Sequence, residues 1–105
     1  MIGTRGEVWF AQLDPTTGSE IRKERPCLVV QPPDMDRLQT TIIVPMTSRG
    51  FPAPYRVATS FGTSSFLLCD HVRSIDRTRL RRYVGRIDDT ELARVLEALR
   101  AIFTA

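Results

Sequence analysis

The 105-residue sequence lacks the features of membrane and secreted proteins. No apolar run approaches the roughly 20 residues needed to cross a bilayer. A charged side chain appears already at Arg5 and no uninterrupted hydrophobic region follows, so we expect no signal peptide. Two cysteines, Cys27 and Cys69, and one histidine are too few for a disulfide framework or a typical metal centre. These absences predict a cytoplasmic protein with two free, buried thiols and no bound metal.

The composition that remains is that of an ordinary globular domain. Apolar residues make up 42% of the chain and charged residues 26%, which excludes an intrinsically disordered chain. A chain of this length builds one compact core and is too short for two domains. We therefore expect residues 1–105 to form a single domain.

Positive charge is concentrated in one segment. Residues 73–86 contain six arginines and one aspartate, a net charge of +5, which leaves −2 for the rest of a chain whose net charge is +3. Such a segment attracts phosphates and other polyanions. A solvated face or an arginine-rich genome would give the same pattern, so the charge alone leaves nucleic-acid binding open.

Short runs of β-forming residues precede one amphipathic helix. Leu92, Val95, Leu96, Leu99, Ile102 and Phe103 recur at the spacing of a single helix face. Asp88, with Glu91 three residues later, is typical of a capping box at the start of that helix. The pattern predicts a mainly β fold, a small curved sheet or partly open barrel covered by a C-terminal helix. We expect strands at 7–12, 26–31, 41–46, 55–59, 66–72 and 83–87, a possible helical turn within 74–82, and the helix over 88–103.

Chain connections bring two distant polar residues together. Only nine residues, 32–40, join the second and third strands, and a connection this short favours antiparallel neighbours. Arg25 before the second strand and Thr47 after the third would then lie at one rim. The 12-residue connection 13–24, long enough to suggest a functional loop, adds Glu20 and Lys23 there. The end of the fifth strand would add Asp70, His71 and Arg73.

A guanidinium beside a hydroxyl suits a phosphate group, because arginine supplies a fork of donors and threonine a neutral donor. The residues alone leave open a structural alternative, in which Arg25 binds a strand-end carbonyl and Thr47 caps a turn.

Three blocks of the sequence resemble a known family. RGEVWFAQLDPTTGSEIRKERPCLVV, TIIVPMTS and FLLCDHVRSIDRTRL are similar, in order and spacing, to the motif blocks of MazF/PemK-type toxins of bacterial type II toxin–antitoxin systems, and ELARVLEALRAIF is similar to the family's final helix. The resemblance implies an SH3-like barrel of the plasmid-maintenance-toxin type with helical additions. It also implies a homodimeric, sequence-selective endoribonuclease that needs no metal or cofactor, cleaves single-stranded RNA and is silenced by an acidic antitoxin.

The resemblance assigns roles to individual residues. The family's catalytic arginine falls on Arg25 and its catalytic threonine on Thr47, which Ser48 follows. The glutamate of its GSE motif falls on Glu20, a loop residue of the RNA site. Its DQIR motif reads DHVR here, so Asp70 and Arg73 match, while His71 replaces a common glutamine whose role does not transfer. With Lys23 and Ser48, these residues are the expected substrate contacts.

The implied reaction is attack of a ribose 2′-hydroxyl on the neighbouring phosphodiester. Arg25 and Thr47 would stabilise the charge that builds on the phosphoryl oxygens, while Glu20, Glu24 and His71 all stay candidates for the general base. Phe51, Tyr55 and Tyr83 are candidates for stacking on bases, and Trp9 is expected in the core. Two alternatives stay open: a gyrase-inhibiting toxin of the related CcdB-like scaffold, and a noncatalytic RNA-binding barrel.

Overall fold

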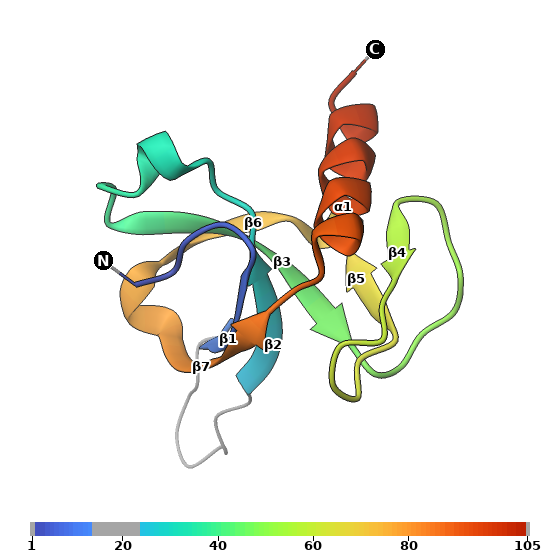
Figure 1. Ribbon diagram of the computed structural model, residues 1–105, viewed down its shortest axis with the longest axis horizontal. Coiled ribbons are helices and arrows are strands. Elements are labelled where there is room, and N and C mark those ends of the chain that lie inside the picture. Colours follow the sequence, from blue (N-terminus) through green and yellow to red (C-terminus); the bar gives the residue numbers. More distant parts are fainter. Residues whose placement is uncertain (1, 14–23, 105) are drawn as a thin grey trace.

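The computed structural model describes residues 2–13 and 24–104, which form one antiparallel sheet and a C-terminal helix (Figure 1). Three short 3₁₀ helices interrupt the connections between strands. The strands are β1 (Glu7–Gln12), β2 (Glu24–Val29), β3 (Thr40–Thr47), β4 (Arg56–Ala58), β5 (Phe66–Leu68), β6 (Arg73–Asp76) and β7 (Leu80–Arg86); the helices are η1 (Pro33–Met35), η2 (Cys69–His71), η3 (Arg77–Arg79) and α1 (Asp89–Ile102).

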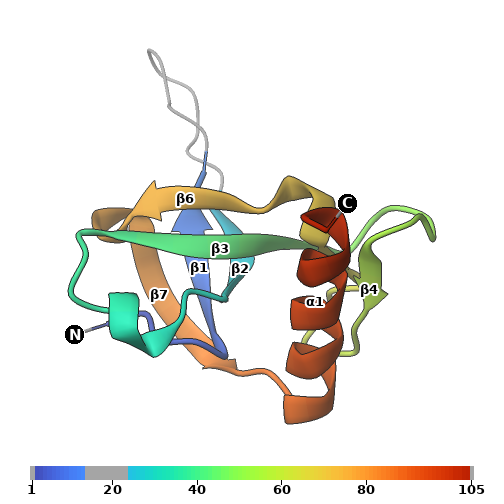
Figure 2. The ribbon, with the colours of Figure 1, turned by 90° about the horizontal axis from the view of Figure 1, so that it is seen from above.

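Strand β3 is the centre of the sheet. The strand order is β4-β5-β3-β2-β1-β7, and β6 also pairs with β3. The first half of β3 pairs with β6, whereas its last two residues pair with β5. Seen from above, β1, β3, β6 and β7 curl around a common interior (Figure 2). The predicted curved sheet covered by a helix is confirmed, and in the described part of the chain the sheet does not close into a barrel.

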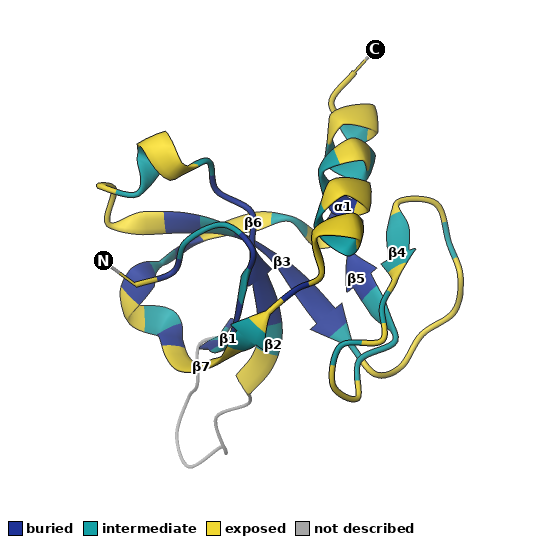
Figure 3. Cartoon of the chain, viewed as in Figure 1, coloured by how far each residue is buried: buried dark blue, intermediate teal, exposed yellow. Residues whose placement is uncertain are grey.

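Both faces of the central strands are buried, which explains their nearly continuous apolar sequence. Successive side chains of a strand point to opposite faces, so Leu28 enters one hydrophobic cluster while Cys27 and Val29 enter another. The first cluster is covered by α1, and the second joins side chains of β1, β2, β3, β6 and β7 inside the curl of the sheet. The buried stretches of β2, β3 and β5 are dark blue in Figure 3. Because both sides of β2 and β3 are packed, the polar ends of these strands are held on a rigid support.

Helix α1 packs against the first cluster through the predicted apolar face, with Val95 fully buried. Two details of the prediction are wrong. Phe103 lies just beyond the helix, which ends at Ile102, and is 75% exposed. Asp88 is the N-cap residue, but its side chain caps no backbone N–H, so the capping-box hydrogen bond is not made. Among the described residues, no helix is long and apolar enough to span a membrane.

The region predicted as one strand over 66–72 contains a short strand and a 3₁₀ helix. Strand β5 ends at Leu68, η2 follows, and β6 then begins at Arg73. The turn at η2 lets the chain leave β5 and join the other half of β3, with Ile75 opposite Thr41. Strand β6 is not among the predicted strands, because the sequence of 74–82 favours a helical turn; in the structure the helical turn is confined to η3. Strand β7 begins at Leu80, three residues earlier than expected, and β2 begins two residues earlier.

Candidate active site

Arg25 and Thr47 lie on neighbouring strands at the same rim of the sheet. Strands β2 and β3 are antiparallel, as the short connection predicted, with Cys27 opposite Pro45. Continuing this register by two residues brings Arg25 opposite Thr47. Both side chains line one open hollow of about 350 Å³, together with Glu24, Ser48 and Arg49. Two residues 22 positions apart in the sequence therefore share one cavity.

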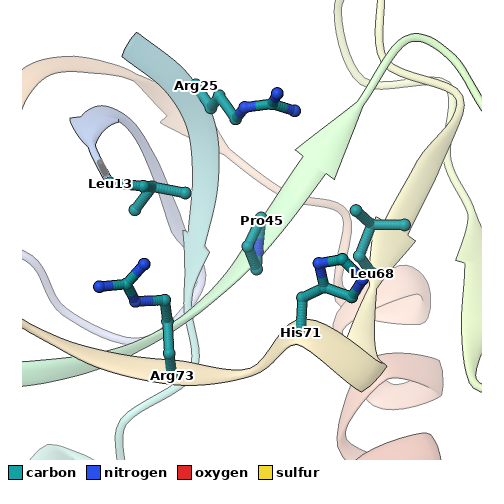
Figure 4. A pocket seen from close by; sticks show the side chains of 6 residues that line it. All are labelled: Leu13, Arg25, Pro45, Leu68, His71 and Arg73. Atoms are coloured by element: carbon teal, nitrogen blue, oxygen red, sulfur yellow. The ribbon is translucent and has the colours of Figure 1, made fainter. Parts of the chain in front are cut away.

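Arg25 also lines a second hollow on its other side, of about 260 Å³. His71 and Arg73 enter this hollow from η2 and β6 (Figure 4). Its apolar walls are Leu13, Pro45 and Leu68. The Arg25 side chain extends from β2 over the space toward which the His71 ring points (Figure 4). The site thus has two compartments that meet at Arg25.

The hydroxyl group of Thr47 is held by local backbone structure. Its Oγ1 accepts a hydrogen bond from the backbone N–H of Arg49 at 3.1 Å. The Thr47 carbonyl oxygen accepts from the backbone N–H of Ser65 at 2.7 Å, and the Ser65 hydroxyl donates to the Ser48 carbonyl oxygen at 3.2 Å. These bonds fix the strand end, and they leave the hydroxyl hydrogen of Thr47 to point toward a ligand.

His71 is in contact with Asp70, which in turn contacts Arg56. Its Nε2 lies 3.6 Å from Oδ2 of Asp70, and the same oxygen lies 3.6 Å from a terminal nitrogen of Arg56. The Arg56 guanidinium lies 5.4 Å from the ring centroid of Phe51, within the range of a cation–π contact. Asp70 therefore faces Arg56 and His71, and it is absent from the residues that line the two hollows.

Two predicted substrate contacts, Glu20 and Lys23, lie outside the described residues. Among the described residues that line the two hollows, Glu24 is the one carboxylate. Within the described part of the chain, no group of three or more histidine, cysteine or acidic side chains is placed to hold a metal ion.

Most arginines of the positive segment 73–86 hold parts of the fold together. Arg77 is 6% exposed, and its guanidinium donates to the carbonyl oxygens of Ile2, Gly3 and Leu38 at 2.6 to 3.0 Å. Four others contact residues that are distant in the sequence and adjacent in the fold. Arg79 donates to the Leu13 carbonyl, Arg81 to the Gln12 side chain and Arg86 to the Arg5 carbonyl. Arg82 stacks over the ring of Phe10. Arg73 is the member of the segment that lines the site. The segment is therefore less available to a polyanion than its charge indicated.

The two cysteines are buried and free, as the sequence predicted. Burial raises the pKa of the Cys27 thiol to about 12, although Arg73 and Arg25 act in the opposite direction. Burial, followed by the Asp70 charge, raises the pKa of the Cys69 thiol to about 11. Both thiols are neutral near pH 7, which makes them unsuitable as nucleophiles.

The aromatic candidates differ in exposure. Phe51 is 68% exposed beside Arg56, close to the His71 support, while Tyr55 is exposed with a positive φ of 64°. Tyr83 lies on β7, where it forms an edge-to-face contact with Trp9 at 5.6 Å. Trp9 is only partly buried and packs at the edge of the second cluster, with its Nε1 donating to Glu7. The expectation that Trp9 belongs to the core holds only in part.

Comparisons with known proteins agree with this geometry. Residues 4–103 match the family model described as PemK-like, MazF-like toxin of type II toxin-antitoxin system. The chain is 35% identical to endoribonuclease PemK of Escherichia coli, over 95% of this chain and 81% of that protein. It is 33% identical to endoribonuclease EndoA of Bacillus subtilis, over 95% and 93%. The structure is similar to that of MazE-MazF from Deinococcus radiodurans, with a TM-score of 0.82 and 27% identity over 97% and 96% of the two chains.

Proposed function

Because the chain belongs to the PemK-like, MazF-like toxin family of type II toxin–antitoxin systems, we propose that it is an endoribonuclease that cuts single-stranded RNA at selected sequences. The observation that supports this most is the shared hollow of Arg25 and Thr47. A fork of guanidinium donors beside a neutral hydroxyl matches the oxygens of a phosphodiester. A gyrase inhibitor or a noncatalytic binding protein has no need of this pair, and the relatives reported above are named endoribonucleases.

The proposed reaction is transesterification within the substrate. The 2′-oxygen of one ribose attacks the adjacent phosphorus, the bond to the 5′-oxygen breaks, and a cyclic phosphate and a 5′-hydroxyl end result. Negative charge builds on the non-bridging oxygens, where Arg25 and Thr47 donate hydrogen bonds. Donors held in place at such oxygens each contribute about 3 to 4 kcal/mol to transition-state stabilisation. The phosphate would lie at Arg25, where the two hollows meet, with Ser48, Arg73, and the loop residues Glu20 and Lys23 as further substrate contacts.

Membership of the family also supports a proposal for the regulation and assembly of the protein. We propose that a single toxin domain over residues 1–105 acts in the cytoplasm as a homodimer, needs no metal ion, and is inhibited by an acidic antitoxin. The MazE-MazF structure from Deinococcus radiodurans is a precedent for the antitoxin complex. The positive net charge of +3 favours an acidic partner as well as RNA.

The decisive experiment is cleavage of a mixed-sequence RNA by the purified protein in the presence of a chelator, with both ends of the products mapped. We expect discrete cuts that leave 5′-hydroxyl ends. Deoxyribose at the cleavage position should abolish cleavage while binding is kept, because the nucleophile belongs to the substrate. Intact RNA would contradict the proposed function, and cleavage of the deoxy-substituted strand would contradict the mechanism.

Single substitutions locate the site. Arg25→Ala and Thr47→Ala should each remove most of the activity while the circular dichroism spectrum stays that of the native protein. Asp34→Asn is a suitable control, because Asp34 is an exposed residue of η1 that lines neither hollow. Full activity in both alanine variants would place the reaction elsewhere.

A further inference from the structure

The second hollow contains a group that the Arg25–Thr47 pair does not supply, namely a base. We infer that His71 is the general base of the reaction and accepts the proton of the attacking 2′-hydroxyl. This inference rests on the proposed ribonuclease function and adds a named proton acceptor to it. It starts from the position of the imidazole in the same hollow as Arg25.

The contact with Asp70 determines which ring nitrogen is available. Nε2 faces the carboxylate at 3.6 Å, so the neutral imidazole carries its hydrogen on Nε2 and keeps the lone pair of Nδ1 for the substrate. The distance is longer than a hydrogen bond, and such contacts in empty active sites commonly shorten when substrate binds. Asp70 is itself held by Arg56. Asp70 is therefore a positioning residue, and His71 is the residue that contacts the substrate.

The surroundings of the imidazole suit a proton acceptor next to a phosphate. Among the described residues, four charged groups surround it: Asp70 beside it on η2, Arg56 from β4, which contacts Asp70, and Arg25 and Arg73 from β2 and β6 across the hollow. The other lining side chains of this hollow are apolar. Among its described lining residues, His71 is thus the one side chain that can offer a nitrogen lone pair to a proton, because the arginines stay protonated.

Glu24 is the competing base among the described residues. It directly precedes Arg25 in β2 and shares the first hollow with Arg25 and Thr47. Glu24 lines the first hollow together with Arg49, and it does not line the second hollow. Because Arg25 lines both hollows, a substrate phosphate bound at Arg25 can be contacted by Thr47 from the first hollow and by an acceptor in the second.

The step balances without a further reactant. The 2′-hydroxyl proton passes to Nδ1 of His71 as the bond from the 2′-oxygen to phosphorus forms. The bond from phosphorus to the 5′-oxygen breaks, and the departing 5′-oxygen takes a proton from water. The imidazolium returns its proton to the solvent before the next turnover. Only neutral His71 can act, so kcat/KM should rise with pH through the titration of this imidazole.

The chain has a single histidine, which makes a direct test possible. The titration midpoint of the His71 ring is measured by NMR on the free protein, where one set of imidazole signals is expected. The pH profile of kcat/KM is then measured on an oligonucleotide containing a mapped cleavage site. Because kcat/KM reports groups of the free enzyme, the rise in activity should be centred on the NMR midpoint. If kcat/KM falls with rising pH around this midpoint, or does not change there, the inference is overturned.

Substitution supplies the second readout. His71→Gln keeps a polar side chain of similar size, and we expect kcat to fall about 10²-fold or more with KM changed only a few-fold, and the rise with pH to disappear. Asp34→Asn should keep both the rate and the pH profile. An RNA with sulfur in place of the 5′-oxygen needs no acid to release its leaving group, so it should leave His71→Gln equally impaired.

The outcomes separate the two proposals. If the native protein cleaves no RNA, the proposed function fails and the role of His71 fails with it. If the native protein cleaves RNA and His71→Gln matches its rate and pH profile, the proposed function stands and the inference is wrong. Rescue of His71→Gln by the 5′-sulfur substrate would make His71 an acid, and a flattened profile in Glu24→Gln alone would identify Glu24 as the base. Either result also overturns the inference.

Discussion

Side chains at the rim of β2 and β3 are held in place by the backbone around them. The Thr47 hydroxyl accepts a hydrogen bond from the backbone of Arg49, so its oxygen has a fixed position before any ligand arrives. This pairing of Arg25 with Thr47 is predictable from sequence, because a nine-residue connection leaves antiparallel pairing as the main choice. The burial of Arg77 is not predictable in this way. Its partners are carbonyl oxygens near residues 2 and 38, and every residue type offers such an acceptor.

Activity should be kept by a substitution at Thr47 that retains the hydroxyl group and lost by one that removes it. We expect Thr47→Val to lower kcat about 10²- to 10³-fold, because valine has a similar shape and no donor for the phosphoryl oxygen. Thr47→Ser should stay within about 10-fold of the native rate. Single-turnover cleavage of a mapped oligonucleotide checks both values. Equal activity in the valine and serine variants would show that the hydroxyl has no role in the reaction.

Glu7 should contribute to stability in a pH-dependent way. Partial burial acts to raise the pKa of its carboxyl, but hydrogen bonds from Trp9 Nε1 and the Thr4 backbone, both at 3.0 Å, outweigh burial and lower it below 4.5. Its contribution is therefore present above the unfolded-state value and is lost as the pH falls through the lower folded-state value. We expect Glu7→Gln to be less stable than the native protein at neutral pH and to lose less stability between about pH 5 and about pH 3.

Urea denaturation across this pH range, followed by the fluorescence of the single tryptophan, measures the effect. Asp34→Asn serves as a control for removal of a carboxylate with no such hydrogen bonds in the described structure. Parallel stability curves for Glu7→Gln and the native protein would show that the carboxylate has the same proton affinity in both states.

Strands and helices are predictable from the sequence where apolar residues recur with a clear helical or strand period. Where the prediction is wrong, the cause lies in how a strand pairs with its neighbours. Strand β1 and helix α1 match their expected positions within a residue or two, because β-forming residues and the 3.6-residue period are strong signals there. The run from Phe66 onward is apolar enough for one strand, yet β5 stops at Leu68 because β3 is shared end to end by β5 and β6. The length of β3 that is free to pair with β5 cannot be read from the sequence of β5.

Helix α1 should depend on its buried face more than on its first residue. We expect Val95→Ala to lower the free energy of unfolding by roughly 2 to 3 kcal/mol, because Val95 is fully buried in the first cluster. Asp88→Ala should cost less than about 1 kcal/mol, since the side chain makes no capping hydrogen bond and contributes only through the helix dipole. Urea denaturation compares the two. A larger cost for Asp88→Ala would indicate that the side chain caps the helix in solution.

At the scale of the whole molecule, the segment with the most positive charge has few arginines that are free to bind phosphate. The segment 73–86 accounts for more than the entire net charge, but its guanidinium groups mostly bind carbonyl oxygens, an amide or a ring. Most of these arginines still add to the long-range field that attracts RNA. Direct contact with phosphate is expected chiefly from Arg73, which lines the second hollow, as well as Arg25.

The salt dependence of RNA binding distinguishes these two kinds of arginine. With a noncleavable deoxy-substituted strand, we expect Arg73→Gln to reduce the slope of log K against log salt by about 0.7, the contribution of one phosphate contact on a single strand. Arg86→Gln removes the same charge at the end of β7, where the guanidinium binds the Arg5 carbonyl, and should leave the slope nearly unchanged. Equal slopes for the two variants would mean that Arg73 acts only through the general field.

Each hydrophobic cluster contains one thiol, Cys69 in the first and Cys27 in the second. Alkylation of these thiols therefore requires local opening, and the two rates report separately on the region beneath α1 and on the interior of the curl. A reagent that labels Cys69 first would show that α1 lifts from the sheet while the support of Arg25 stays closed. The two native thiols thus allow the opening of the two clusters to be timed separately, with no cysteine introduced by mutation.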